Sequence, residues 1–241
     1  MMSEGINKFK YKGISSADMG LIITQAPHIT SPKRDEEFVS VPGRSGDVIV
    51  DNGRFENTTV SYDVAMLSDE RPLELMARKI KAWLQGETGY FKLTDTYDPN
   101  YYRMAAYSGN IDIEDKVRKI GITTLNFNCK PFKYRTDGEN DIVLTASATI
   151  YNPEVWQSLP YIKIIGTGAV TLSVNNNSFY ISSIDEYIEI DSELQSAYKG
   201  AVLQNPKINF ATFPILSEGA NNISWVGNVS KIIIKPRWCS I

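Results

Sequence analysis

The sequence has few of the residues that enzymes use most, with one histidine and two cysteines among 241 residues. The histidine, His28, follows a proline in a segment typical of a surface loop, and no second histidine is present to serve Cys129 or Cys239 as a base. A nucleophile with its base, or a zinc ion with its ligands, needs such groups in close spacing. We therefore predict that the chain is not an enzyme, has no catalytic residues and binds no metal or cofactor.

Long apolar runs and clusters of basic residues are also missing. No apolar segment approaches the length that spans a bilayer, and the first residues lack the basic-then-apolar pattern of a signal peptide. Lysine and arginine number 25 against 28 acidic residues, which gives a net charge of −3, and they form no cluster. These absences argue against a membrane protein and against a nucleic-acid-binding patch. They predict a chain made in the cytoplasm, where both cysteines stay free thiols.

Two segments superficially resemble ligand sites. Residues 43–46, Gly-Arg-Ser-Gly, lack the Gly-Lys-Ser/Thr ending of a phosphate-binding loop, so we interpret them as a tight turn that presents Arg44. The loop 95–100, Asp-Thr-Tyr-Asp-Pro-Asn, offers oxygen ligands but lacks the glycine and the closing glutamate of an EF-hand. We expect it to be an ordered turn capped by Asp and Asn side chains.

One helix is predicted, and Gly86 should end it. Ser68 can cap its first turn, Asp69 and Glu70 place negative charge there, and Pro72 is tolerated that early. Apolar residues recur at helical spacing and form one face, as expected of a helix packed on a sheet. The residues of this face are Leu73, Met76, Ala77, Ile80, Trp83 and Leu84.

The rest of the first part reads as short strands separated by turns. Residues 37–41 lead into the turn at 42–46, and residues 48–50 lead to Asn52-Gly53, a dipeptide favoured in hairpin turns. Charged and turn-forming residues from 133 to 140 predict a domain boundary near Arg135.

The second part is predicted to be all β, as a two-sheet sandwich or jelly roll of about eight short strands. Residues 175–177, three asparagines, mark the tip of a hairpin. The predicted strands are residues 142–150, 161–165, 169–174, 178–181, 187–190, 202–204, 221–225 and 231–235.

The order of these features resembles the distal tail protein (Dit) family of siphophages, often labelled phage tail component. Each motif is weak alone, but the series spans nearly the whole chain and is specific. In the first part the motifs are Tyr11-Lys12-Gly13, Asp18-Met19-Gly20-Leu21, Val41-Pro42-Gly43-Arg44-Ser45-Gly46, Trp83-Leu84, Asp98-Pro99-Asn100-Tyr101-Tyr102 and Phe127-Asn128-Cys129-Lys130-Pro131. In the second part they are Leu159-Pro160-Tyr161-Ile162-Lys163-Ile164, Ile188-Glu189-Ile190-Asp191-Ser192-Glu193, Phe213-Pro214, Glu218-Gly219-Ala220-Asn221 and Pro236-Arg237-Trp238.

The resemblance implies a structural protein of a phage or prophage tail tip. Residues 1–135 resemble the ring-forming domain, a β-sandwich with one helix and a projecting hairpin that crosses to the next subunit. Residues 136–241 resemble the galectin-like β-sandwich (jelly roll) on the outside of the ring.

The resemblance also implies partners. In the family, six copies form a homohexameric ring, and we leave open whether one ring or two stacked rings form. The ring joins the tail tube protein to the tail-tip hub or tail-associated lysin protein, and DNA passes its channel without specific binding. Some members also hold receptor-binding proteins. The implied location is the virion, at the tail tip, after synthesis in the host bacterial cytoplasm.

Interface residues are predicted on this basis. Turn signals at both ends favour residues 41–55 as the projecting hairpin, and a deletion of residues 44–53 should leave a folded monomer. The interface candidates are Arg44, Trp83, Arg237 and Trp238. A core position is the simpler interpretation of Trp83, and a strand-end position that covers the sandwich is the simpler one of Trp238.

The sequence departs from the family pattern in two places. Asn152-Pro153-Glu154 stands where a glycine-containing turn is expected, and the second part lacks the histidine, arginine and acidic cluster with which galectins hold galactose. An alternative function is a carbohydrate-binding sandwich for attachment to a host surface, for which tyrosines and Trp225 would serve. A tail-associated hydrolase is a third hypothesis, for which no catalytic set is visible.

Overall fold

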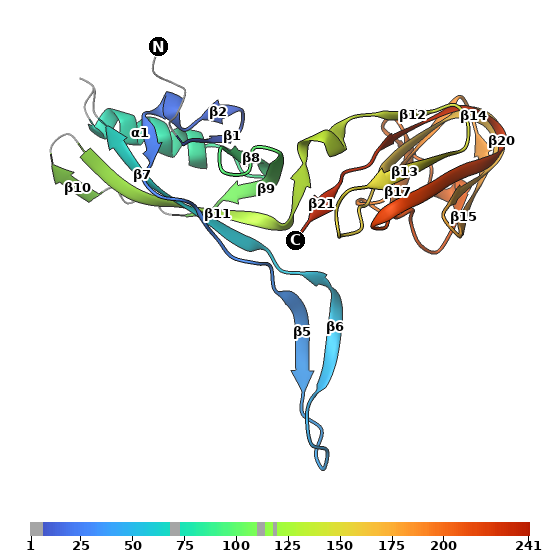
Figure 1. The fold of residues 1–241 in the computed structure, drawn as a ribbon, viewed down its shortest axis with the longest axis horizontal. Coiled ribbons are helices and arrows are strands. Elements are labelled where there is room, and N and C mark those ends of the chain that lie inside the picture. Colours follow the sequence, from blue (N-terminus) through green and yellow to red (C-terminus); the bar gives the residue numbers. More distant parts are fainter. Residues whose placement is uncertain (1–6, 68–72, 110–113, 118–119) are drawn as a thin grey trace. The chain divides into compact units, whose positions relative to one another are not determined.

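The computed structural model describes residues 7–67, 73–109, 114–117 and 120–241. Within these ranges the chain is mainly β with one α-helix, α1 (Leu73–Gln85) (Figure 1). The chain divides into two compact units, residues 1–133 with Ile241 (unit 1) and residues 134–240 (unit 2). The predicted fold class, mainly β with one helix, a projecting hairpin and a second β-sandwich, is confirmed.

Unit 1 is built on one large antiparallel sheet. Its strand order is β2-β1-β8-β9-β11-β7-β3, with β10 paired to β11 and β4 paired to β7. Exposed His28 lies on the short strand β4, at the side of the sheet. The strands are β1 (Phe9–Tyr11), β2 (Ile14–Ser15), β3 (Leu21–Ile23), β4 (His28–Ile29), β7 (Thr58–Leu67), β8 (Phe91–Asp95), β9 (Tyr101–Tyr107), β10 (Glu114–Val117) and β11 (Ile120–Arg135).

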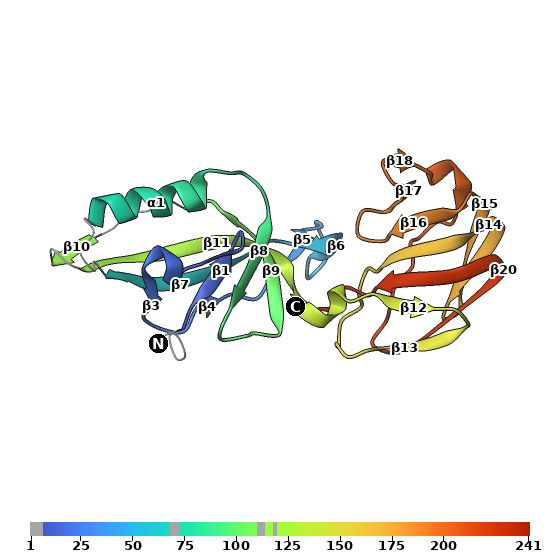
Figure 2. The same ribbon diagram turned by 90° about the horizontal axis from the view of Figure 1, so that it is seen from above.

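The core of unit 1 lies between this sheet and α1, which runs along one face of it (Figure 2). The helix buries the predicted apolar stripe at Met76, Ile80, Trp83 and Leu84. After α1, the N–H of Gly86 donates to the carbonyl of Ala82 at 3.0 Å, and a side chain at Gly86 would meet that same oxygen. The predicted helix and its end are thereby confirmed. The expected cap and first turn, Ser68 to Pro72, lie outside the described residues.

A two-stranded hairpin leaves unit 1 between β4 and β7. It consists of β5 (Arg34–Val39) and β6 (Val48–Phe55), which pair only with each other among the described strands (Figure 1). The turn at residues 40–47 forms its tip. The projecting hairpin was predicted, but it begins earlier in the chain than residue 41.

The prediction of a second hairpin turn at Asn52-Gly53 is wrong. Both residues lie inside β6, where the pairing with β5 shifts register. The Asp51 carboxylate accepts a hydrogen bond from the Gly53 N–H at 2.8 Å, and Gly53 has a φ of 71° that favours glycine. The dipeptide therefore makes a bulge rather than a turn.

Unit 2 is a curled β-sandwich in which two long strands, β14 and β20, take part in both sheets. One sheet has the order β12-β20-β14-β16-β17-β18, and β13, β15 and β19 extend the other halves of β20 and β14. The 3-10 turns are η1 (Ala17–Met19) in unit 1, and η2 (Thr136–Glu139) and η3 (Asn205–Lys207) in unit 2. The strands are β12 (Ile142–Leu144), β13 (Ala148–Asn152), β14 (Tyr161–Val174), β15 (Asn177–Ile184), β16 (Tyr187–Asp191), β17 (Ser196–Lys199), β18 (Val202–Leu203), β19 (Ile208–Asn209), β20 (Gly219–Lys235) and β21 (Cys239–Ser240).

The two long strands β14 and β20 replace four short predicted strands, because each strand bends at a corner and continues beyond it. The register of β14 against β20 shifts between Ile165 and Val170. A side chain at Gly166 would lie 2.3 Å from the Asn228 carbonyl oxygen, and one at Gly227 would lie 2.6 Å from that of Ala169. Glycine thus lets the two strands approach closely at the corner. Conversely, the predicted strand 142–150 is divided into β12 and β13.

The turn at Asn152 does without the glycine expected there. Buried Asn152 donates from its side chain to the carbonyls of Trp156 at 3.0 Å and Leu216 at 3.3 Å, and it accepts from the Glu154 N–H at 3.0 Å. An asparagine side chain that bonds its own backbone two residues on is a known substitute for a backbone turn. The sequence departure therefore has a local structural explanation.

Candidate assembly interface

The distal half of the β5–β6 hairpin exposes apolar side chains on both of its faces. Phe38 and Ile49 are directly paired on one face and are 61% and 58% exposed. Val39 and Val50 on the other face are 38% and 43% exposed. We call these four residues the distal patch. Large apolar groups this exposed on both faces of one thin element indicate a surface that another molecule covers.

The base of the hairpin carries charged pairs instead. Arg34 contacts the Asp51 carboxylate at 3.2 Å, and Arg54 contacts Asp35 at 2.6 Å. Asn52 also donates to Asp35 at 3.0 Å. The charged side chains at the base are therefore paired with one another, and the exposed apolar surface is confined to the distal half.

The hairpin is anchored to unit 1 by an aromatic contact. The ring of Phe55 packs edge-on against Phe132 of β11 at 5.8 Å between centroids, and the Arg34 guanidinium lies 4.9 Å from the Phe55 ring centroid. The Glu56 N–H donates to the Lys33 carbonyl at 2.8 Å. The two strands of the hairpin are therefore held together where they leave the sheet. This anchoring matters because an isolated two-stranded hairpin is only marginally stable in water.

The tip of the hairpin is the tight turn predicted at residues 42–46. The Arg44 N–H donates to the Val41 carbonyl at 3.1 Å, and Gly43 and Gly46 have φ values of 81° and 84°. The Arg44 side chain is exposed, and the structure gives it no charged or hydrogen-bonded partner within the described residues. Exposed Asp47 is likewise without such a partner among them. The tip thus presents one free cation and one free anion.

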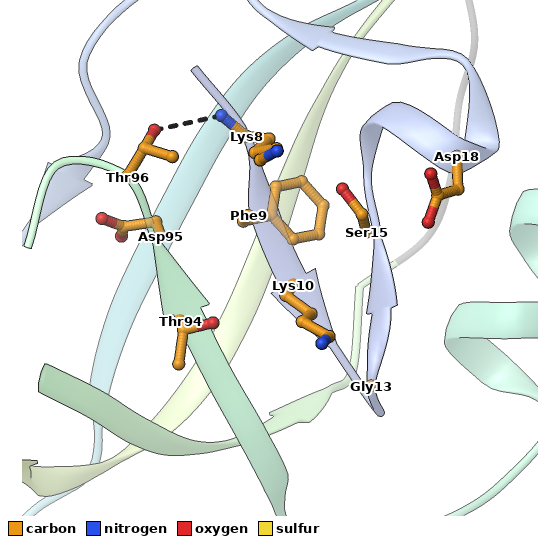
Figure 3. A pocket seen from close by; sticks show the side chains of 9 residues that line it. All are labelled: Lys8, Phe9, Lys10, Gly13, Ser15, Asp18, Thr94, Asp95 and Thr96. Atoms are coloured by element: carbon orange, nitrogen blue, oxygen red, sulfur yellow. Dashed lines mark hydrogen bonds between the residues drawn. The ribbon is translucent and has the colours of Figure 1, made fainter. Parts of the chain in front are cut away.

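An open pocket of about 330 Å³ lies at the edge of the unit 1 sheet, beside β1, β2 and the end of β8 (Figure 3). Lys10 lines it from β1, Lys8 from the residue just before β1, and Asp18 from η1. The remaining charged group, the Asp95 carboxylate, already accepts hydrogen bonds from the backbone N–H groups of Tyr97 at 2.8 Å and Asp98 at 3.0 Å. The other oxygen of the Asp95 carboxylate accepts a hydrogen bond from the hydroxyl of buried Tyr62 at 2.6 Å.

The bonds of Asp95 also explain the loop at 95–100. Its carboxylate caps the turn, as predicted, and its pairing leaves it no role as a free ligand in the pocket. Among the residues that the structure describes, no group of three or more histidine, cysteine or acidic side chains could hold a metal ion. The described part of the chain also contains no helix long and apolar enough to cross a membrane.

Trp83 lies in the core of unit 1. Its side chain is 7% exposed, its ring stacks on Phe9 at 5.9 Å between centroids, and its indole N–H donates to the Tyr11 carbonyl at 3.2 Å. The structure therefore accounts for Trp83 by contacts inside its own unit. An interface role for it stays a prediction.

Arg237 and Trp238 are also held by contacts within their own unit. The Arg237 guanidinium binds both carboxylate oxygens of Asp191 at 2.8 Å, and Trp238 is 5% exposed in the core of unit 2. Burial alone would raise the pKa of the Asp191 carboxyl, but the bonds from Arg237 and from the N–H groups of Glu193 and Leu194 outweigh it and lower that pKa. The acidic partners of Arg237, which the sequence did not identify, are Asp191 and, at 3.6 Å, Glu193.

The two cysteines are buried free thiols, as predicted. Burial raises the pKa of Cys129 and of Cys239 to about 12. Since the thiolate is the reactive form, both groups stay protonated and unreactive at neutral pH.

The distal patch and the pocket were missed in the sequence. The signal for the patch was present, because Phe38-Val39 and Val48-Ile49-Val50 are apolar runs without the alternation of a strand that has one solvated face. The pocket had no local signal, because its lining comes from segments almost 80 residues apart in the chain.

Comparison with known proteins agrees with this architecture. Residues 17–129 match the family model of the phage tail protein RIFT-related domain. The chain is similar to the crystal structure of the Dit protein (gp 19.1) of phage SPP1, with a TM-score of 0.75 and 14% sequence identity over 95% of this chain and 98% of that one. That protein is described as a paradigm of the hub adsorption apparatus in phages that infect Gram-positive bacteria. No curated protein matches the sequence.

These two likenesses confirm the resemblance to the distal tail protein family. The family match covers most of unit 1, and the similar fold extends through both units.

Proposed function

We propose that this chain, a phage tail protein with a RIFT-related domain and the fold of a distal tail protein, forms a homohexameric ring at the tip of a siphophage or prophage tail. Unit 1 builds the ring, and unit 2, as a galectin-like sandwich, lies on its outside. The ring joins the tail tube to the tail-tip hub or lysin protein and leaves a channel through which DNA passes. The protein then resides in the virion after synthesis in the host cytoplasm, and it acts without catalysis.

The observation that carries this proposal is the distal patch. A hairpin that is apolar on both faces and pairs with no other described strand needs cover from outside its own chain. In a cyclic assembly each copy contributes one surface and receives the complementary one, so every hairpin is covered when the ring closes. The unpaired edges of β5 and β6 also offer backbone groups to a neighbour.

Arg44 is the sequence-predicted residue best placed for such a contact. It stands exposed at the tip, whereas Trp83 and Trp238 are buried and Arg237 is paired with Asp191. The proposed subunit interface therefore centres on residues 34–55, and the three other candidates support it by holding the folded units together.

A shortened hairpin tests the proposal. The structure shows that deletion of residues 44–53 would remove most of β6 and leave β5 unpaired, so a cleaner variant replaces residues 36–51 with Asn-Gly and retains the Arg34–Phe55 pair. We expect a folded monomer that still unfolds in a cooperative thermal transition. A ring that survives in this variant, seen by light scattering, would contradict the proposal.

The carbohydrate-binding alternative rests on tyrosines and Trp225 of unit 2. Trp225 is half-buried and packs against the core of unit 2, while Tyr151 and Tyr180 are 69% and 45% exposed. Binding to a broad glycan array that is abolished by a change on the surface of unit 2 would support this alternative.

A further inference from the structure

Two surfaces of unit 1 carry exposed charged groups of both signs. The hairpin tip presents Arg44 and Asp47, and the pocket presents Asp18 with Lys8 and Lys10. None of these five side chains has a charged or hydrogen-bonded partner among the described residues. Arg44 and Asp47 are three residues apart in one turn, and Asp18 lines the same pocket as Lys8 and Lys10.

We propose that this pocket receives the hairpin tip of a neighbouring copy of the same chain. The inference rests on the proposed ring and names the receiving site within it. The Arg44 guanidinium pairs with the Asp18 carboxylate, and the Asp47 carboxylate lies against the ammonium groups of Lys8 and Lys10.

The shape and polarity of both partners fit this arrangement. The tip is a tight turn whose residues 40–47 are all exposed, so another molecule can reach it. Val41 beside the tip and Ile14 beside the pocket are 39% and 37% exposed, so an apolar contact can flank the charged one. The pocket is open to solvent, as entry of a loop from another molecule requires.

A second copy suits the pocket better than a simple anion or cation does. Lys8 and Lys10 would attract an anion, but the carboxylates of Asp18 and Asp95 line the same space and oppose it. A partner that carries both signs, separated by two turn residues, complements Asp18 and the two lysines. The tip of this chain is such a partner.

The test is disulfide crosslinking in the full-length chain. Asp18→Cys and Arg44→Cys are combined in one protein, and the native thiols do not compete because both are buried. Under mild oxidation we expect covalent dimers and larger species up to a closed ring. A mixture of the two single variants should stop at covalent dimers, because each chain then carries only half of the contact.

The control replaces Asp18→Cys by Glu74→Cys, on the exposed side of α1. The combination of Glu74→Cys with Arg44→Cys should give no covalent dimers or larger species. If Asp18→Cys with Arg44→Cys does not crosslink while the intact protein forms a ring, the receiving site is wrong and the ring stands. If the intact protein forms no ring, with or without tail partners, the proposed function fails as well.

Charge reversal provides an independent measurement. Asp18→Lys alone and Arg44→Glu alone should each weaken association by about two- to fivefold per contact, the range of an exposed ion pair, and the two together should recover part of the loss. Losses that simply add, with no recovery in the combined variant, would overturn the pairing. Labelling of Asp18→Cys by a soluble maleimide at the same rate before and after assembly would overturn the docking site itself.

Discussion

Arg237→Ala should destabilise unit 2 because it removes one half of a buried charged pair. The Asp191 side chain is 3% exposed and that of Arg237 is 25% exposed, and two bonds of 2.8 Å join them. Removal of one partner from a fully buried pair costs about 3–5 kcal/mol. Here the loss should be smaller, about 2–3 kcal/mol, because Arg237 reaches solvent and Asp191 keeps its two backbone N–H donors.

The expected change is large enough for a thermal melt. For a domain of this size, each kcal/mol shifts the melting temperature by about 4–8 °C, so the transition of unit 2 should fall by about 10–20 °C. Arg237 has a φ of 54°, and alanine meets the same backbone constraint as arginine, so the substitution isolates the side chain. Near-ultraviolet circular dichroism follows the transition of each unit.

The pH dependence provides a second check on the same pair. The pKa of the Asp191 carboxyl is lowered in the folded protein, so the pair stabilises fully above the ordinary aspartate pKa of about 3.9 and less as the pH falls through the lowered value. The stability deficit of Arg237→Ala should therefore be full near pH 7 and shrink below about pH 4.

A matched control is Lys199→Ala, which removes exposed pairs. Lys199 contacts Asp185 at 3.1 Å and Glu186 at 3.0 Å, and those carboxylates are 78% and 76% exposed. Its melting temperature should match that of the intact protein. An Arg237→Ala melt within about 2 °C of the intact protein, or a deficit that is unchanged in acid, would refute the reasoning about Asp191.

Three further results are expected. Trp83→Ala should destabilise unit 1 by about 3–5 kcal/mol in a denaturant titration, because a buried indole is lost from an aromatic core, and a loss under 1 kcal/mol would contradict that position. Phe38→Ser with Ile49→Ser should leave the monomer melt unchanged and abolish the ring in sedimentation velocity; an intact ring would show that the distal patch is not an interface. Cys129 and Cys239 should resist a thiol reagent at pH 8 until the protein unfolds, and rapid labelling of the native protein would contradict their burial.

Local patterns in the sequence predicted the structure correctly where only one structure fits the pattern. The apolar stripe from Leu73 to Leu84 predicts α1, and Gly86 predicts its end, because helix periodicity and a stop signal agree. Cys129 and Cys239 were predicted to be free thiols because a chain made in the cytoplasm keeps its cysteines reduced, and both are free. The tight turn around Arg44 followed from its glycines.

The features that the sequence did not predict depend on contacts between residues far apart in the chain. Asn52-Gly53 favours a turn locally, but pairing of Phe38 with Ile49 places it inside β6, where the dipeptide is used as a bulge. Gly166 looks like a strand end, yet it lets β14 bend against β20 without breaking. The lining of the pocket, and Asp191 as the partner of Arg237, depend on contacts between distant segments that no local pattern specifies.

The mass of the purified protein in solution tests the central claim most directly. Light scattering after size exclusion, over a range of concentrations and with the tail tube or hub protein added in parallel, measures it without any substitution. The account predicts a species near six times the 27.0 kDa of one chain, alone or once a tail partner is present. A protein that stays monomeric at every concentration and with either partner would contradict the ring.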